Sequence, residues 1–252
     1  MSGFHLKTKN QDKQRERAER FEVAFNKIHN QLKKLANNDD KFFREDRFST
    51  LVHTVKDRHP SIRMYKDDLL SYARLRNAIV HEKMRKNYFI ADPHGEVVKN
   101  IEKIAQFLLE PPKATTIASK PVKAYETTDD LKTVLIDMGK CPFTQYPVYE
   151  DGKFSFLLTE SGITSFLADQ FVDNLIDFSN ETVLSIKPYE CYHAVTFVSR
   201  SYDVFQIEDL FEKSLQEKRK LEAVIVTENG RETEKPLGII TAWDLIKVER
   251  NL

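Results

Sequence analysis

The stretch that decides the fold of the second half of the chain is PLGIITAWDL, residues 236–245. Gly238 opens a β-branched run that favours a strand, and Ala242 to Leu245 has the composition of a first helical turn. A strand that runs into a helix presents free backbone N–H groups at the helix start. Thr241 adds a hydroxyl there, and Asp244 adds a carboxylate that can accept both hydroxyls of a ribose. The same spacing also suits a local role, in which Thr241 caps the helix and Asp244 completes a capping box.

A weaker copy of this stretch, FLLTESGI, lies 82 positions earlier and starts at Phe156. Each copy follows a strand and a hairpin signal, Asp151-Gly152 in the first and Asn229-Gly230 in the second. Upstream of each hairpin we predict an amphipathic helix, over about residues 128–138 with Thr128 as its cap, and over about residues 206–218. The residues expected to face inward are Leu131, Val134, Leu135 and Met138 in the first helix, and Leu210, Phe211 and Leu215 in the second. A unit of strand, helix, strand, hairpin, strand and helix therefore occurs twice.

The two units resemble the CBS-domain family, and the resemblance covers about residues 121–248. In that family two such units form one pseudo-symmetric pair, also called a Bateman module. The pair commonly binds an adenosyl ligand in a cleft between its units. The ligand signature of the family is a Gly, an apolar pair, Ser or Thr, two further residues and then Asp.

Only the second copy matches this signature in full, through Gly238, Thr241 and Asp244. The first copy keeps Thr159, but its other two signature positions are Phe156 and Gly162. The resemblance therefore implies one working adenosine site and not two.

The resemblance also implies roles for single residues. Asp244 would take the ribose hydroxyls, and Thr241 a ribose or phosphate oxygen. The base would be enclosed by Ile239 and by backbone around Ile117, Val122, Thr144 and Gln145. Glu222 stands where some members carry a basic residue facing phosphates, which disfavours a triphosphate. Trp243 would either stack on the ligand or pack at the junction.

The implied ligand is a regulatory adenine nucleotide, namely AMP, ADP, ATP or cyclic di-AMP, and no cofactor is required. Because Glu222 disfavours a triphosphate, AMP, ADP or a dinucleotide stands ahead of ATP.

Composition is typical of an intracellular protein with two domains. The chain has 252 residues and a formal net charge of zero, but residues 1–110 hold 23 Lys and Arg against 16 Asp and Glu. This imbalance suggests different partners for the two halves, attraction between the halves, or chance on solvated helices. Cys141 and Cys191 lack metal-like spacing and suggest a reduced compartment. Since no apolar run approaches about 18 residues, we expect a soluble, cytoplasmic protein without a membrane contact or a bound metal.

The first half of the chain is predicted to be a bundle of four antiparallel helices. Apolar residues at steps of three and four predict helices over about residues 15–35, 41–58 and 65–86. A fourth helix is predicted to begin at Asp92-Pro93, with the proline at its first position, and to end at Glu110-Pro111-Pro112. Residues 113–120 are expected to form a linker that packs along the second domain.

The third predicted helix contains the stretch ARLRNAIVHE, residues 73–82. Asn77 and His81 are four residues apart and share a face, and the long side chain of Arg76 can reach the same groove. Polar side chains amid apolar ones are costly unless they meet polar partners. This motif resembles that of the HEPN family, which is Arg, often Asn, three or four residues and then His on a late helix of a four-helix bundle. The resemblance covers about residues 15–110.

In active HEPN proteins two such helices face each other across a dimer, and the paired Arg and His cut RNA without a metal. A His can move the proton of a ribose 2′-hydroxyl, and an Arg can stabilise charge on the phosphate. The resemblance therefore implies a homodimer in which Arg76, Asn77 and His81 are catalytic residues of a metal-independent endoribonuclease. A structural role stays open, in which Asn77 and His81 only hydrogen-bond across the dimer interface.

The expected fold class is α+β, with a HEPN-like four-helix bundle at residues 1–112 and a CBS pair at residues 113–252. The pair is divided into a first unit at about 121–170, a linker helix region at 171–193 and a second unit at about 194–250. The expected function is adenine-nucleotide sensing that controls an RNA-binding or RNA-cleaving dimer. The alternative is a non-catalytic sensor or scaffold whose helical domain only mediates dimerisation or partner binding.

Overall fold

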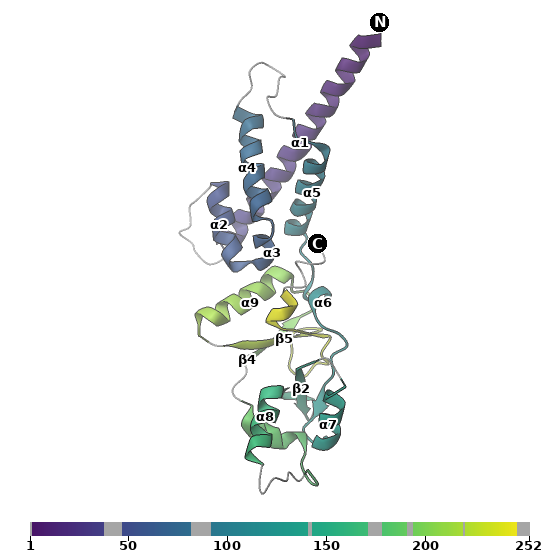
Figure 1. Ribbon diagram of the computed structural model, residues 1–252, viewed down its shortest axis with the longest axis vertical. Coiled ribbons are helices and arrows are strands. Elements are labelled where there is room, and N and C mark those ends of the chain that lie inside the picture. Colours follow the sequence, from purple (N-terminus) through teal and green to yellow (C-terminus); the bar gives the residue numbers. More distant parts are fainter. Residues whose placement is uncertain are drawn as a thin grey trace. The chain divides into compact units, whose positions relative to one another are not determined.

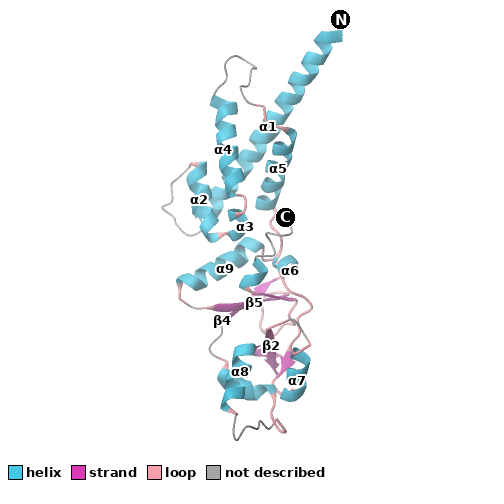
Figure 2. Cartoon of the chain, viewed as in Figure 1, coloured by secondary structure: helices cyan, strands magenta, loops and turns pink. Residues whose placement is uncertain are grey.

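The computed structural model describes residues 2–37, 47–81, 92–140, 143–170, 178–190, 194–218 and 220–245, and for residues 2–11, 80 and 81 only the backbone. The chain divides into two compact units, Met1–Pro112 and Lys113–Leu252. The first contains helices only and the second mixes strands and helices, so the α+β class is confirmed for the described residues (Figures 1 and 2). Within those ranges, no helix combines the length and apolar character needed to cross a membrane.

The N-terminal unit is built from five helices in the described residues: α1 Ser2–Asn37, α2 Phe48–Arg58, α3 Pro60–Arg63, α4 Lys66–His81 and α5 Gly95–Leu109. The apolar residues of α1 that recur at helical spacing are buried, with Phe21, Ile28 and Leu32 fully inaccessible. The unit thus forms because each long helix turns one apolar stripe toward a shared core.

Two details of this unit differ from the prediction. Arg47 is extended, so α2 cannot run unbroken from residue 41, and residues 41–46 lie outside the described part. Pro93 is not the first residue of α5, because His94 is the N-cap and its Nδ1 accepts the Glu96 N–H at 3.4 Å.

The directions of the first and last helices also depart from a simple antiparallel bundle. Arg17 pairs with Asp92, and Arg20 pairs with Glu102 at 2.7 Å. Residue numbers therefore rise together along α1 and α5, which run in the same direction (Figure 1). The HEPN-like four-helix arrangement is not confirmed.

The C-terminal unit contains two equivalent sets of elements, preceded by the one-turn helix α6 Ala114–Ile117. We call residues 125–169 the first repeat, with β1 Tyr125–Glu126, α7 Leu131–Met138, β2 Gln145–Glu150, β3 Lys153–Thr159 and α8 Glu160–Asp169. We call residues 194–245 the second repeat, with β4 Ala194–Ser199, α9 Val204–Gln216, β5 Leu221–Thr227, β6 Gly238–Ile240 and a helical turn at 242–245.

Each repeat forms a three-stranded sheet of the same topology, with the first strand parallel and the last antiparallel to the middle one. The register aligns Val148 with Phe156 in the first sheet and Val226 with Gly238 in the second. Phe156 and Gly238 are therefore equivalent positions, and the predicted internal repeat is confirmed.

The two predicted hairpin turns differ. Asp151 and Gly152 have positive φ angles of 50° and 75° and join β2 directly to β3, as an Asp-Gly turn predicts. Asn229 and Gly230 instead begin a longer connection, since β5 ends at Thr227 and β6 starts at Gly238.

The helix boundaries of the repeats also need correction. Asp130 and not Thr128 caps α7, because its carboxylate accepts the Thr133 N–H at 2.8 Å. Leu215, predicted to face inward, is 70% exposed in the last turn of α9, while Phe211 one turn earlier is buried.

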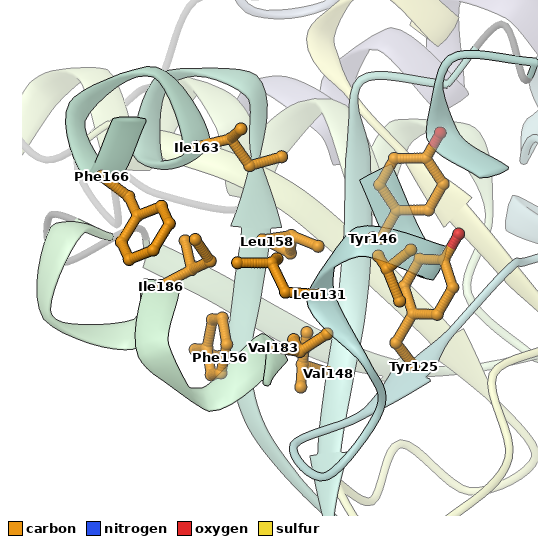
Figure 3. Packing of buried hydrophobic residues seen from close by; sticks show 11 residues of the cluster. Tyr125, Leu131, Tyr146, Val148, Phe156, Leu158, Ile163, Phe166, Val183 and Ile186 are labelled. Atoms are coloured by element: carbon orange, nitrogen blue, oxygen red, sulfur yellow. The ribbon is translucent and has the colours of Figure 1, made fainter. Parts of the chain in front are cut away.

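The core of the first repeat extends beyond the repeat itself (Figure 3). The 3₁₀ helix η1, Val183–Tyr189, places Val183 and Ile186 against Leu131, Leu158 and the other buried residues of this core. The Leu131 N–H donates to the Glu181 carbonyl at 3.0 Å, which fixes the connection against the start of α7. The connection between the repeats therefore completes the first one.

Candidate functional site

The signature stretch folds as predicted into a strand followed by a helical turn. β6 ends at Ile240, Thr241 is the junction residue, and residues 242–245 are helical. The Thr241 backbone N–H and hydroxyl both donate to Oδ2 of Asp244, at 2.8 and 2.9 Å. The carboxylate thus satisfies a backbone donor at the helix start, which is one half of a capping box.

Asp244 is a buried carboxylate, with 4% of the residue exposed. Its other oxygen, Oδ1, accepts a hydrogen bond of 3.0 Å from the hydroxyl of Ser119, 125 positions earlier in the chain. A buried charge is costly unless it is hydrogen-bonded, and these three donors offset that cost. The Asp244 half of the predicted local capping role is therefore present, and the carboxylate also accepts a hydrogen bond from a hydroxyl outside the junction.

The segment that supplies Ser119 lies directly on β6. Ser119 and Ile239 form an antiparallel bridge in which the N–H of each donates to the carbonyl of the other, at 2.9 and 3.3 Å. A Cβ placed on Gly238 would lie 2.5 Å from the Cβ of Ala118, which is closer than carbon atoms approach. The signature glycine therefore permits the close approach of this segment, and the prediction that residues 113–120 pack along the second domain is confirmed.

Two of the predicted base-enclosing residues share an apolar cluster beside the junction. Ile239 belongs to a buried group with Leu157, Ala223 and Ile225, and Val122 packs against that group. Since Leu157 comes from β3 and the others from β5 and β6, the sheets of the two repeats contact each other here. Ile117, at the end of α6, is also buried.

Thr144 and Gln145, the other two residues predicted to enclose the base, lie at the start of β2. The Gln145 amide group donates to a carboxylate oxygen of Glu222 at 3.4 Å, and Glu222 also pairs with Lys220 at 2.7 Å. The amide oxygen of Gln145 is buried and has no hydrogen-bond partner among the described residues. Thr144 is exposed.

The equivalent junction in the first repeat uses a carboxylate from elsewhere in the chain. The Thr159 N–H and hydroxyl donate to the two carboxylate oxygens of Glu190, at 2.6 and 2.9 Å. Gly162 occupies the position of Asp244, and a Cβ built on it would lie 2.2 Å from Oε1 of Glu190. Glu190 therefore occupies the space in which an aspartate side chain at position 162 would lie.

Helix α4 contains the Arg-Asn-His motif. Arg76 is half-buried, and its Nε has no hydrogen-bond partner among the described residues. Asn77 is exposed. The side chain of His81 lies outside the described part, so the structure does not test whether these three groups meet.

Sequence analysis missed two residues of the junctions, Ser119 and Glu190. Ser119 gave no local signal, because its partner Asp244 lies 125 positions away. The glycine at position 162 was a signal for Glu190, since it removes a carboxylate that a helix start favours. Trp243 is 78% exposed, so the packing role for it is wrong and its indole face is open to solvent.

Comparison with known sequences identifies the second repeat. Residues 193–251 match the family described as CBS domain. No curated protein gives a significant match. The match supports a CBS domain at residues 193–251, which contain the second repeat, and the first repeat shares its strand topology outside the matched range.

Three solved structures that contain CBS domains show partial similarity to this chain at low sequence identity. A CBS domain-containing protein of unknown function from Kribbella flavida is 16% identical, with a TM-score of 0.42, over 56% of this chain and 99% of that one. The CBS domain of a bacterial CNNM/CorC family Mg²⁺ transporter in complex with ATP is 21% identical, with a TM-score of 0.40, over 60% and 96%. The CBS domain of a membrane protein from Sphaerobacter thermophilus is 17% identical, with a TM-score of 0.42, over 60% and 97%.

Proposed function

We propose that the C-terminal unit is a regulatory module that binds an adenine nucleotide at the junction of the second repeat. Asp244 accepts hydrogen bonds from the ribose hydroxyls, and Thr241 contacts a ribose or phosphate oxygen. The observation that supports this most directly is the buried Asp244 carboxylate, which already holds a hydroxyl group on Oδ1 within a CBS domain. Ile239 and Val122 offer an apolar surface beside it for the base.

Isothermal titration with AMP tests this assignment. Asp244→Asn keeps the side-chain size but removes the charge, and we expect affinity to fall about 10- to 100-fold, since a hydrogen bond to a charged group contributes roughly 1.5–3 kcal/mol. Glu232→Gln is a matched control, because Glu232 is an exposed acidic residue of the connection between β5 and β6. The proposal also requires 2′-deoxy-AMP to bind more weakly than AMP. Equal binding of AMP to the wild type and to Asp244→Asn would contradict it.

The charge around Gln145 bears on which nucleotide binds. Glu222 is a carboxylate at the start of β5 with 11% of its side chain exposed, and Lys220 pairs with it. We propose that this pair leaves no net positive charge for a triphosphate, so that AMP, ADP or a dinucleotide such as cyclic di-AMP or NAD binds more tightly than ATP. Parallel titrations with these nucleotides and with S-adenosylmethionine rank the candidates.

A second candidate function concerns α4 and the helical unit. The buried Nε of Arg76 has no acceptor among the described residues, and such a donor is costly unless a partner chain or a phosphate supplies one. We propose that the protein is a homodimer in which Arg76, Asn77 and His81 act in metal-independent RNA cleavage under control of the nucleotide. Within the described part of the chain, no group of three His, Cys, Asp or Glu residues could hold a metal ion.

RNA cleavage by the purified protein in EDTA tests this second proposal. We expect products with a 2′,3′-cyclic phosphate, and loss of cutting in Arg76→Ala and in His81→Ala. Arg74→Ala is the matched control, because Arg74 is an exposed arginine two positions away on α4. Cutting that survives His81→Ala would reject the mechanism. A dimer with no cutting of any RNA would leave the scaffold alternative, in which the helical unit only mediates dimerisation or partner binding.

A further inference from the structure

The residues that enter the C-terminal unit, 113–119, contact the second repeat near both of their ends. We call them the entry segment. Lys113 forms a bridge with Asp203, and the Ala114 N–H donates to the Tyr202 carbonyl at 2.7 Å. Ala114 is fully buried, and Ser119 pairs with Ile239 at the other end. This segment follows directly on Pro112, the last residue of the helical unit.

The hydrogen bond that Ser119 makes at the end of the entry segment resembles one that a ribose hydroxyl would make. The Ser119 hydroxyl donates to Oδ1 of Asp244 at 3.0 Å, while Thr241 donates twice to Oδ2. An aliphatic hydroxyl on this oxygen is the same donor that a ribose 2′- or 3′-hydroxyl offers.

Close packing leaves no space for both hydroxyls. Asp244 is 4% exposed, so its carboxylate offers almost no surface to a second donor while Ser119 is in place. The entry segment already packs closely on β6, since a Cβ built on Gly238 would lie 2.5 Å from the Cβ of Ala118. A ribose can therefore reach Oδ1 only when the Ser119 hydroxyl leaves it.

We propose that Ser119 is an internal competitor for the nucleotide, and that the ribose displaces it from Asp244 and releases the end of the entry segment from β6. This inference rests on the proposed binding of an adenine nucleotide at Asp244. It supplies a route for regulation, because the released residues belong to the chain that leads from the helical unit. Ser119 acts here as a positioning residue that holds Asp244 when no nucleotide is bound.

Hydrogen exchange of the full-length protein, with and without saturating AMP, tests the proposal. In the wild type, the Ser119 amide is protected by its bond to the Ile239 carbonyl, and we expect AMP to raise its exchange rate at least tenfold. In Ser119→Ala the competing hydroxyl is absent, so AMP should bind about threefold to tenfold more tightly. Thr116→Ala is the matched control, because Thr116 is an exposed hydroxyl residue of the same segment.

The outcomes separate this inference from the function on which it rests. AMP binding that is weakened by Asp244→Asn, together with unchanged exchange at residues 118–119, would overturn the inference and keep the proposed site. The same holds if Ser119→Ala binds AMP with the wild-type affinity. Failure of AMP and of the other nucleotides to bind the wild type would overturn both.

Discussion

At the strand–helix junction of each repeat in the C-terminal unit, a carboxylate accepts hydrogen bonds from a threonine. The two carboxylates come from different places in the chain. In the second repeat the carboxylate comes from the helix itself, as Asp244, and receives the Thr241 N–H and hydroxyl. In the first repeat it comes from Glu190, beyond η1, and receives the Thr159 N–H and hydroxyl. The physical requirement is an acceptor for the free donors of the helix start, and either source meets it.

The difference shows how a signature position can change without loss of the interaction. Gly162 has no side chain, and the space this leaves is filled by the end of the Glu190 side chain. The first junction is filled by the Glu190 carboxylate, whereas in the second a serine hydroxyl lies on the Asp244 carboxylate. If a ligand hydroxyl replaces that serine hydroxyl, as proposed above, we expect one nucleotide per chain, at the second repeat.

The largest effect on stability is expected from Gly162→Asp, which places in the first repeat the aspartate that the second repeat has at position 244. Gly162→Asp would place a second carboxylate in the space of Glu190, where a Cβ alone lies 2.2 Å from Oε1. Either two carboxylates share a cramped site or Glu190 leaves and loses its two hydrogen bonds. We expect the free energy of unfolding to fall by roughly 3 kcal/mol or more, because two hydrogen bonds to a charged group at about 1.5–3 kcal/mol each are disturbed, as measured by urea denaturation.

A second substitution should reverse most of this loss. In Gly162→Asp with Glu190→Ala, the aspartate can bond Thr159 as Asp244 bonds Thr241, so the double variant should be more stable than Gly162→Asp alone. A double variant less stable than both single variants would show that Glu190 does not stand in for the missing aspartate.

A smaller effect on stability is expected from a substitution of Gly238, the residue of the second repeat that is equivalent to Phe156. Gly238→Ala would push its Cβ against Ala118, at 2.5 Å, and so strain the contact between β6 and the entry segment. We expect a loss of about 1–3 kcal/mol, as for overpacking in a core, seen as a lower midpoint of denaturation. Gly139→Ala is the control, since its Cβ would meet its nearest atoms at 3.6 Å. Equal stability of the two variants would exclude a tight contact at Gly238.

The smallest effect concerns the turns, where the second repeat has a longer connection than the first. The side-chain and backbone N–H groups of Asn229 donate to Glu234 and lower the pKa of its carboxyl to about 2. Because the folded-state pKa is depressed, the stabilisation is present above the ordinary Glu pKa of about 4.3 and is lost as pH falls toward about 2.

Titration of the Glu234 carboxyl by NMR measures this directly. Asn229→Ala should raise the pKa of Glu234 toward the ordinary value. The substitution removes the side-chain amide of Asn229, the hydrogen-bond donor that lowers this pKa most. An unchanged pKa in that variant would assign the depression to another group.

Much of the fold was predictable because its signals are local. Alternation, turn residues and helical spacing predicted the repeated unit, the Asp151-Gly152 turn and the buried stripe of α1, and all three are confirmed. Caps and helix ends were less predictable, since Thr128 and Asp130 are both good caps by composition and only the structure shows that α7 begins after Asp130.

Within the candidate site, only the contacts between residues that are close in the sequence could be predicted. Thr241 and Asp244 are three positions apart and their contact follows from the turn of a helix. Ser119 and Glu190 act on residues 125 and 31 positions away, and no periodicity or motif encodes such pairs. The roles of Ile117, Val122, Thr144 and Gln145 toward a ligand remain predictions.

The placement of η1 and Glu190 has a consequence for the order of folding during synthesis. The first repeat begins at Tyr125, but Val183 and Ile186 complete its core and Glu190 completes its junction. A ribosome that has released only residues up to the end of α8 exposes an unfinished core and a Thr159 N–H that still lacks the Glu190 carboxylate as its acceptor. The core and the junction of the first repeat are therefore completed only after the chain that leads into β4 has emerged.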